Sequence, residues 1–143
     1  MKKCLVILIA LLPLTAAAQQ HTLEELAAHL GTDRISLQYA FTIAQPAPVK
    51  LSGVLLIQGD CYQAKGNGVE IYCDGTTRWT VDPASREVYI ETAGDIEEFA
   101  LWQDDLEDLS LTQVRYLPVS DDLSPFFFDT AALDADWVVT DLR

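Results

Sequence analysis

The most constraining stretch of this sequence is residues 68–90, where three short runs of alternating apolar and polar residues are separated by two turn signals. Alternation with a period of two is typical of β-strands with two different faces. Asp74-Gly75 supplies the positive φ of a tight turn, and Pro83 fixes φ in a second, wider turn. The stretch therefore predicts a three-stranded antiparallel meander, with strands at 69–73, 78–81 and 87–91. Further strands are expected at 35–43, 51–58, 61–65, 110–117, 125–129 and 137–142.

The first 18 residues have the pattern of a secretory signal peptide. Two lysines precede an apolar run at 5–14, and residues 16–18 are the small alanines that signal peptidase reads. The apolar run is too short to span a bilayer comfortably. We therefore expect cleavage near Ala18, export and a single domain of residues 19–143.

Two helical segments are expected beside the strands. Thr22 and Glu25 form a capping box at the start of residues 22–30, whose apolar side chains follow helical spacing. Residues 95–103 suggest one or two further helical turns. The two histidines, His21 and His29, lie off the apolar stripe, so both are expected to be solvated. The fold class is therefore mainly β (α+β).

Cys61 and Cys73 flank the turn sequence Gly66-Asn67-Gly68. In an exported protein they would face an oxidising compartment. A hairpin centred on Asn67 would set them directly opposite each other and allow a disulfide, whereas a one-residue change of register would separate them. The two interpretations are thus a bridge or a pair of small buried side chains. A metal site is not expected, because no histidine lies near either cysteine.

Charge and motifs argue against most kinds of chemistry. The net charge of −13 disfavours nucleic acid, whose phosphates would repel the protein. The sequence has no nucleophile elbow, phosphate-cradling glycine loop or zinc spacing, and the acidic cluster at 104–108 lacks the spacing of a calcium loop. We therefore expect no enzyme activity, no catalytic residue and no cofactor.

Several expected strands are apolar on both faces. Leu55 adjoins Leu56, Tyr89 lies between Val88 and Ile90, and residues 126–128 are three phenylalanines in a row. One face of such a sheet can pack on a helix, and a concave apolar face that is incompletely filled can hold an acyl chain. Helices that cover both faces would explain the pattern equally well.

Residues 69–90, with the core 72–83 that runs from Tyr72-Cys73-Asp74-Gly75 to Val81-Asp82-Pro83, resemble the periplasmic outer-membrane lipoprotein carriers (LolA-like proteins). Those proteins have an aspartate-glycine turn, then a strand with a tryptophan, here Trp79, and then a turn closed by proline. The order of leader, short helix and strands also matches over residues 23–92, and is similar to the short Bacteroidetes-type form of the family.

The resemblance implies a curved antiparallel half-barrel, closed by helices, whose concave face shields acyl chains of lipids or lipoproteins on the way to the outer membrane. Inner- and outer-membrane transport partners would follow from it. One parity of the strands is expected to line the cavity. Its residues are Leu37, Tyr39, Phe41, Leu55, Ile57, Ile71, Trp79, Val81, Val88 and Ile90. The rival interpretations are a lipid sensor on the same fold and a structural β-domain with a filled core.

Overall fold

The computed structural model of the chain describes residues 24–26, 28–29, 31–43, 46–93 and 106–143, with side chains from residue 110 in the last range. The expected signal peptide and the helical turns expected at 95–103 lie outside the described residues. Residues 24–26 and 28–29 are helical, which agrees with the helix expected there. Among the described residues, no helix is long and apolar enough to cross a membrane.

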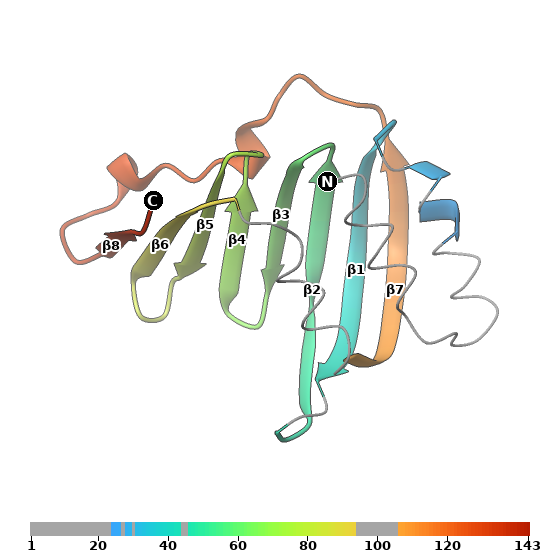
Figure 1. The fold of residues 1–143 in the computed structure, drawn as a ribbon, viewed down its shortest axis with the longest axis horizontal. Helices are drawn as coiled ribbons and strands as arrows, with labels where there is room; N and C mark the ends of the chain where they lie inside the picture. The colour runs from blue at the N-terminus through green and yellow to red at the C-terminus, as the bar shows by residue number, and fades with distance from the viewer. Residues whose placement is uncertain (1–23, 27, 30, 44–45, 94–105) are drawn as a thin grey trace.

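Eight strands of the described residues form one open sheet (Figure 1). The strands are β1 (Arg34–Ile43), β2 (Val49–Gln58), β3 (Cys61–Gly66), β4 (Val69–Cys73), β5 (Thr77–Asp82), β6 (Glu87–Thr92), β7 (Leu106–Leu117) and β8 (Val138–Asp141). Their order is β7-β1-β2-β3-β4-β5-β6-β8, so strands consecutive in sequence are neighbours from β1 to β6. The mainly β prediction is confirmed. The sheet is mixed rather than all antiparallel, because β8 pairs with β6 in parallel.

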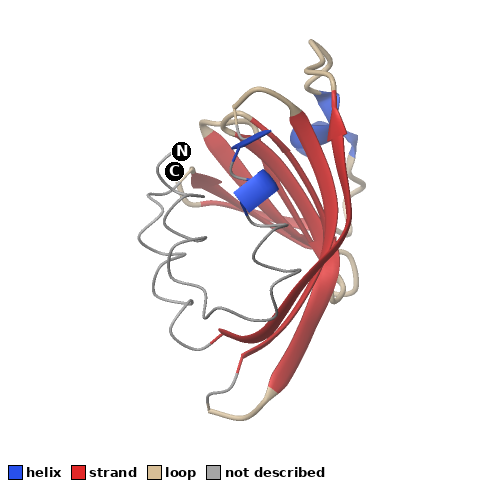
Figure 2. Cartoon of the chain, turned by 90° about the vertical axis from the view of Figure 1, so that its right-hand side faces the viewer, coloured by secondary structure: helices blue, strands red, loops and turns tan. Residues whose placement is uncertain are grey.

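The sheet is strongly curved, like a half-barrel (Figure 2). Two irregularities in the pairing of β7 with β1 contribute to the curvature, since bulges bend and twist a strand. The first of them contains Gln113, which has a left-handed φ of 49°. We call the inner side of the sheet the concave face and the outer side the convex face. Leu37, Leu55 and Ile71 lie in one row of the concave face.

The turn between β3 and β4 consists of two residues, Asn67 and Gly68, with φ values of 55° and 77°. Positive φ at both positions is typical of the tight hairpin turn that matches the strand twist. The side chain of Asn67 also reaches β2: its Oδ1 accepts from the Ser52 N–H at 3.3 Å, and its Nδ2 donates to the Lys50 carbonyl at 3.4 Å. Asn67 therefore bonds to the part of β2 that extends past the end of β3.

Two hydrophobic cores lie on opposite faces of the sheet. On the concave face, Leu26 from the helical residues packs on Ile35 and Leu37 of β1, with Tyr116 of β7 beside them. On the convex face, the core is formed by side chains of β4, β5 and β6. Its buried members are Tyr72, Trp79, Val81, Val88 and Ile90.

The convex core is covered by the crossover segment, residues 118–137, which connects the two edge strands β7 and β8 (Figure 1). It contains two short 3₁₀ helices, η1 (Ser124–Phe126) and η2 (Thr130–Ala132). Phe128, Leu133 and Trp137 of this segment pack against the convex core. Figure 2 shows the short helical residues on the concave side and the 3₁₀ helices on the convex side.

Polar side chains of β2 and β3 attach the start of the crossover segment to the sheet. The Gln58 amide donates to the Ser120 carbonyl at 2.8 Å and accepts from the Ser120 N–H at 3.1 Å. The Gln63 amide donates to the Pro125 carbonyl at 2.7 Å. The crossover segment is irregular, so its backbone N–H and C=O groups lack the partners that a strand or helix would provide. These side-chain hydrogen bonds supply such partners where the segment lies on the sheet.

The strand expected at 125–129 is wrong. Pro125 lies in the 3₁₀ helix η1, and the chain leaves it in an extended conformation at Phe127. The three phenylalanines take three different environments: Phe126 is fully buried, Phe127 is exposed and Phe128 is half-buried. A proline at the start of a helical turn, where its missing N–H costs nothing, explains why this apolar run is not a strand.

Candidate functional site: the concave apolar face

The concave face of β1–β4 is built from apolar and aromatic side chains without a single charge. The strand registers place the odd-numbered residues of β1, β2 and β4, and the even-numbered residues of β3, on this face. These residues are Ile35, Leu37, Tyr39, Phe41, Ile43, Val49, Leu51, Gly53, Leu55, Ile57, Tyr62, Ala64, Gly66, Val69, Ile71 and Cys73. The convex face of β1–β3 carries polar and charged residues among its members, including Arg34, Gln38, Lys50, Gln63 and Lys65.

Many of the concave apolar side chains remain partly accessible. Phe41, Leu51, Leu55 and Ile71 are half-buried, and Leu55 and Ile71 lie in the middle of their strands. Burial by desolvation raises the pKa of the Tyr39 hydroxyl above its ordinary value, so this part of the face has a low-polarity environment. Apolar surface of this kind is typical of sites that receive an apolar ligand.

Six of the ten residues expected to line a cavity lie together on the concave face: Leu37, Tyr39, Phe41, Leu55, Ile57 and Ile71. The other four, Trp79, Val81, Val88 and Ile90, lie on the convex face, and the prediction for them is wrong. The register of β4 with β5 explains the error. Ile71 pairs with Thr80, so Trp79 shares a face with Tyr72 instead.

These four residues are packed into the convex core, so they do not belong to a site on the concave face. Trp79 is only 6% exposed, and the ring of Phe127 meets its indole edge-on, with centroids 5.1 Å apart. The ring of Phe128 lies 5.4 Å from that of Tyr72 in the same core. Such aromatic pairs contribute packing energy beyond their buried area. The tryptophan of the family-like motif is therefore part of the packed interior.

Cys61 and Cys73 are both buried free thiols, so the disulfide interpretation is wrong. The two-residue turn pairs Cys73 with Tyr62, and Cys61 pairs with Gln58 on the other side of β3. Neighbouring residues of a strand point to opposite faces, so Cys61 and Cys73 lie on different faces of the sheet. The interpretation as two small buried side chains is correct. Desolvation raises the pKa of both thiols, which disfavours the reactive thiolate.

Two glycines shape the middle of the concave face. A Cβ atom built on Gly53 would lie 2.4 Å from the Lys65 carbonyl oxygen and 2.6 Å from the Tyr39 hydroxyl oxygen. One built on Gly66 would lie 2.1 Å from the Ser52 carbonyl oxygen. The phenol of Tyr39 thus lies directly over Gly53, its partner in the register. A larger residue would have to displace the backbone or the ring.

One row of the concave face, at the end of the sheet where β4 ends and β5 begins, combines polar groups of several strands. The registers align Ile57, Tyr62, Cys73, Arg78 and Glu91 across five strands. Desolvation raises the pKa of the Tyr62 hydroxyl, which also hydrogen bonds with Arg78 and with Cys73. We call this row the polar rim.

The ion pair of the polar rim joins β5 to β6. The Arg78 Nη2 atom donates to Glu91 Oε2 at 2.7 Å, and Arg78 Nε donates to the same oxygen at 3.2 Å. The Arg78 side chain is 18% exposed and that of Glu91 is 36% exposed. Desolvation alone would lower the pKa of Arg78, but the hydrogen bond to Glu91 and the Tyr62 contact raise it overall. The pair is therefore charged and partly dehydrated.

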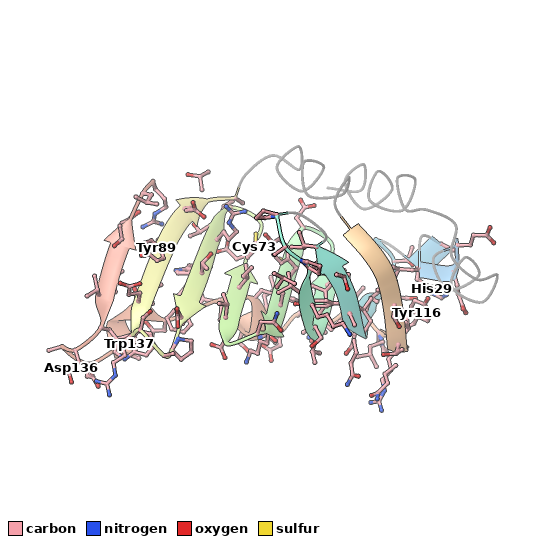
Figure 3. The ribbon with its side chains drawn as sticks, turned by 90° about the horizontal axis from the view of Figure 1, so that it is seen from below. His29, Cys73, Tyr89, Tyr116, Asp136 and Trp137 are labelled. Carbon is pink, nitrogen blue, oxygen red and sulfur yellow. The ribbon has the colours of Figure 1, made fainter. Side chains whose placement is uncertain are left out.

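Sequence reasoning missed a cluster around His29 at the β7 edge. The expectation that His29 is solvated is wrong, because its ring stacks on Tyr116 with centroids 3.8 Å apart and its Nδ1 bonds to Asp33. Figure 3 shows His29 and Tyr116 together at this end, far from Tyr89 and Trp137 at the other. The i,i+4 spacing of His29 and Asp33 was the available signal. His21 lies outside the described residues.

Among the described residues, no group of His, Cys, Asp and Glu side chains is arranged to hold a metal ion. The acidic cluster at 104–108 falls mainly outside the described residues. No protein-family model matches the chain, and no curated protein matches its sequence. The concave face is therefore interpreted from its own residues.

Proposed function

We propose that the protein is a non-catalytic carrier that binds acyl chains of lipids or lipoproteins on the concave face of its half-barrel. The observation that carries the proposal is the uncharged, partly accessible surface that β1–β4 present on this face. Burial of an acyl chain contributes about 0.8 kcal/mol per methylene group. A ligand with a long chain therefore gains useful affinity from apolar contacts alone.

The curvature of the sheet favours an elongated apolar ligand over a flat partner surface. Leu37, Leu55, Ala64 and Ile71 follow one another along a row across four strands. Rows of small and branched side chains on the inside of a curved sheet contact an acyl chain along its length. The opposite faces of β1–β3 carry charged residues, so they offer no equivalent surface.

The resemblance of residues 69–90 to LolA-like carriers supports lipoproteins as the cargo, and the leader-like residues 1–18 support a periplasmic location. On this proposal the protein carries lipoproteins toward the outer membrane. It would receive them from an inner-membrane donor and pass them to an outer-membrane acceptor. No covalent step is needed, because both transfers are exchanges of bound acyl chains.

A titration with the methyl ester of cis-parinaric acid, a fluorescent acyl probe, tests the proposal on the exported protein. We expect saturable binding to the wild-type protein. Leu55→Asp should weaken it by at least about tenfold, because it sets a carboxylate into the apolar surface. The matched control is Val54→Asp: Val54 is the preceding residue, lies on the convex face and is 47% exposed, so binding should be unchanged.

A second pair of variants keeps the test valid if Leu55→Asp does not fold. Phe41→Gln changes a half-buried concave residue, and Ala40→Gln changes its exposed convex neighbour. Only the first should weaken probe binding. A wild-type protein that is folded and shows no saturable binding would contradict the proposal and favour a structural β-domain with a filled core. Probe binding that responds equally to both members of a pair would place the ligand elsewhere.

A further inference from the structure

The polar rim gives the concave face two chemically different parts. Beyond it, the neighbouring row from Leu37 to Ile71 is apolar across β1–β4. In the rim itself, Tyr62 brings a hydroxyl, Arg78 a guanidinium and Glu91 a carboxylate to the same face. A surface that is apolar across β1–β4, and polar at the rim and along the rest of β5 and β6, matches an amphiphile with a chain and a head group.

The charge of the rim is already balanced within the protein. The hydrogen bonds that Arg78 Nη2 and Nε donate to Glu91 end on the same carboxylate oxygen, at 2.7 and 3.2 Å. A guanidinium that is only 18% exposed and paired in this way has little charge left to attract a second anion. Tyr62 adds hydrogen-bonding capacity without adding charge.

The other charged residues of the concave face of β5 and β6 are acidic. Asp82 and Glu87 pair with each other in the register and lie two rows further along the same strands. An anionic head group at the rim would therefore be repelled by three carboxylates of this face, those of Asp82, Glu87 and Glu91. The one arginine that could attract it, Arg78, is already paired. The net charge of −13 adds to this repulsion at longer range.

We propose that the polar rim holds an uncharged, hydrogen-bonding head group, such as an ester, amide or hydroxyl group, and discriminates against a free carboxylate. This inference rests on the proposed function, since it specifies which acyl compounds the concave face accepts. The chain then lies on the apolar rows of β1–β4, and the head group contacts Tyr62 and the Arg78–Glu91 pair. Acylated molecules with esterified or amide-linked chains fit this site, and free fatty acids do not.

Competing probes that differ only in the head group test the inference. At pH 8, cis-parinaric acid is a carboxylate and its methyl ester is uncharged. The wild-type protein should bind the ester at least about fivefold more tightly than the acid. Glu91→Gln leaves Arg78 without its carboxylate partner, so the affinity for the acid should rise about tenfold relative to the affinity for the ester.

Glu87→Gln is the matched control, because it removes the same charge from the same face of β6 and leaves Arg78 and Glu91 paired. It should change the ratio of the two affinities much less than Glu91→Gln. Arg78→Gln is the second variant: it removes the positive charge and should weaken acid binding at least about fivefold further. Circular dichroism of each variant confirms that it is folded.

The outcomes separate this inference from the proposed function. Tighter binding of the acid than of the ester by the wild-type protein overturns the head-group inference, and so does an equal effect of the two glutamate variants. In either case, loss of ester binding in Leu55→Asp still supports the carrier. Absence of binding of both probes overturns the carrier, and the head-group inference fails with it.

Discussion

The two halves of this sheet use opposite faces for their hydrophobic residues. In β7, β1 and β2, the buried hydrophobic cluster lies on the concave face, where Leu26 packs on it from outside the sheet. In β5 and β6 the buried hydrophobic residues lie on the convex face, where Phe128, Leu133 and Trp137 of the crossover segment cover them. The half that the chain covers itself serves stability. The half that keeps accessible apolar side chains is the one available to a ligand.

The change of face takes place at β4. Tyr72 belongs to the convex core, whereas Ile71 beside it continues the apolar concave surface. From β5 onward the concave side carries Arg78, Thr80 and Asp82. A strand that is apolar on both faces is thus the boundary between two environments. This arrangement gives one sheet a packed core on one face and a partly accessible apolar surface on the other.

The comparison predicts the largest loss of stability for Trp79→Ala. Truncation of a 6% exposed tryptophan in the convex core should lower the free energy of unfolding by about 3–5 kcal/mol. Phe41→Ala, in the half-buried concave surface, should cost less. Urea denaturation measures both. If Phe41→Ala is the more destabilising of the two, the concave face is the tighter core and the comparison fails.

The milder variant Trp79→Phe sharpens the same comparison. It keeps an aromatic ring in the convex core and should fold, with unchanged binding of the fluorescent ester. A clear loss of ester binding in this variant would mean that the tryptophan contacts the ligand, as the family resemblance implies.

Gly53→Ala should have the next largest effect, at about 1–3 kcal/mol, because its new Cβ would overlap the Lys65 carbonyl and the Tyr39 phenol. The strain falls on the concave half, so ester binding should weaken together with stability. Tyr39→Ala combined with Gly53→Ala removes the ring but not the backbone clash, and should restore stability only in part. If Gly53→Ala costs no stability, β2 and β3 must be further apart than the 2.4 Å between the new Cβ and the Lys65 carbonyl oxygen implies.

Asn67→Ala should cost about 1–2 kcal/mol, since alanine disfavours the φ of 55° and cannot bond to Ser52 and Lys50. Asn67→Gly tolerates the turn and loses only the amide, so it should cost less than Asn67→Ala. Chemical denaturation separates the two contributions. The turn conformation fixes the register between β3 and β4 and so the faces of the two halves. If Asn67→Ala and Asn67→Gly lower the free energy of unfolding equally, this conformation contributes nothing of its own.

The smallest effect is expected at Asp74, in the turn that joins β4 to β5. Desolvation raises the pKa of this carboxyl, but hydrogen bonds from the Thr77 and Thr76 N–H groups, at 2.8 and 3.0 Å, lower it overall. A lowered pKa stabilises the folded state above the unfolded pKa of about 3.9, and this stabilisation is lost as the pH falls through the folded value.

Asp74→Asn should therefore be less stable than wild type at pH 7, by under about 1 kcal/mol, and the gap should close below about pH 4. Asp121→Asn makes the same change of charge at an exposed site of the crossover segment and should show no such gap. Thermal unfolding over pH 2.5–7 provides the measurement. A gap that persists at the lowest pH would indicate a cause other than the carboxylate.

Alternation of residues was enough to find most strands of this fold, because burial of one face imposes a period of two. Residues 69–73 were placed correctly, and β1, β3, β5 and β6 to within one residue at each end. The sequence could not show which face of the sheet each residue occupies, because the register between two strands depends on the length of the turn that joins them. A three-residue turn at 66–68 would pair Cys61 with Cys73, and the two-residue turn at Asn67 and Gly68 pairs Cys73 with Tyr62.

The face of the sheet was predicted correctly for residues of β1 and β2, where alternation along the strand decides it, and wrongly for β5 and β6, which follow several turns. Phe41 lies in β1 and Leu55 in β2, two long strands that pair with each other without a break. The two residues were assigned to the same face correctly. Trp79 and Val88 lie several turns further along, and their face was wrong. The ion pair of Arg78 with Glu91 joins residues 13 apart and has no signal in the local sequence.

The position of β7 has a consequence for how the chain folds. β1 to β6 form from local hairpins, whereas β7 pairs with β1 through contacts such as Arg34 with Leu117. Closing so long a loop is slow, because its entropy is lost before the contacts form. We expect the meander to assemble first and the β7–β1 ladder to dock in a later kinetic phase. Until then the outer edge of β1 is unpaired, so a newly synthesised chain would pass through a state open to strand exchange.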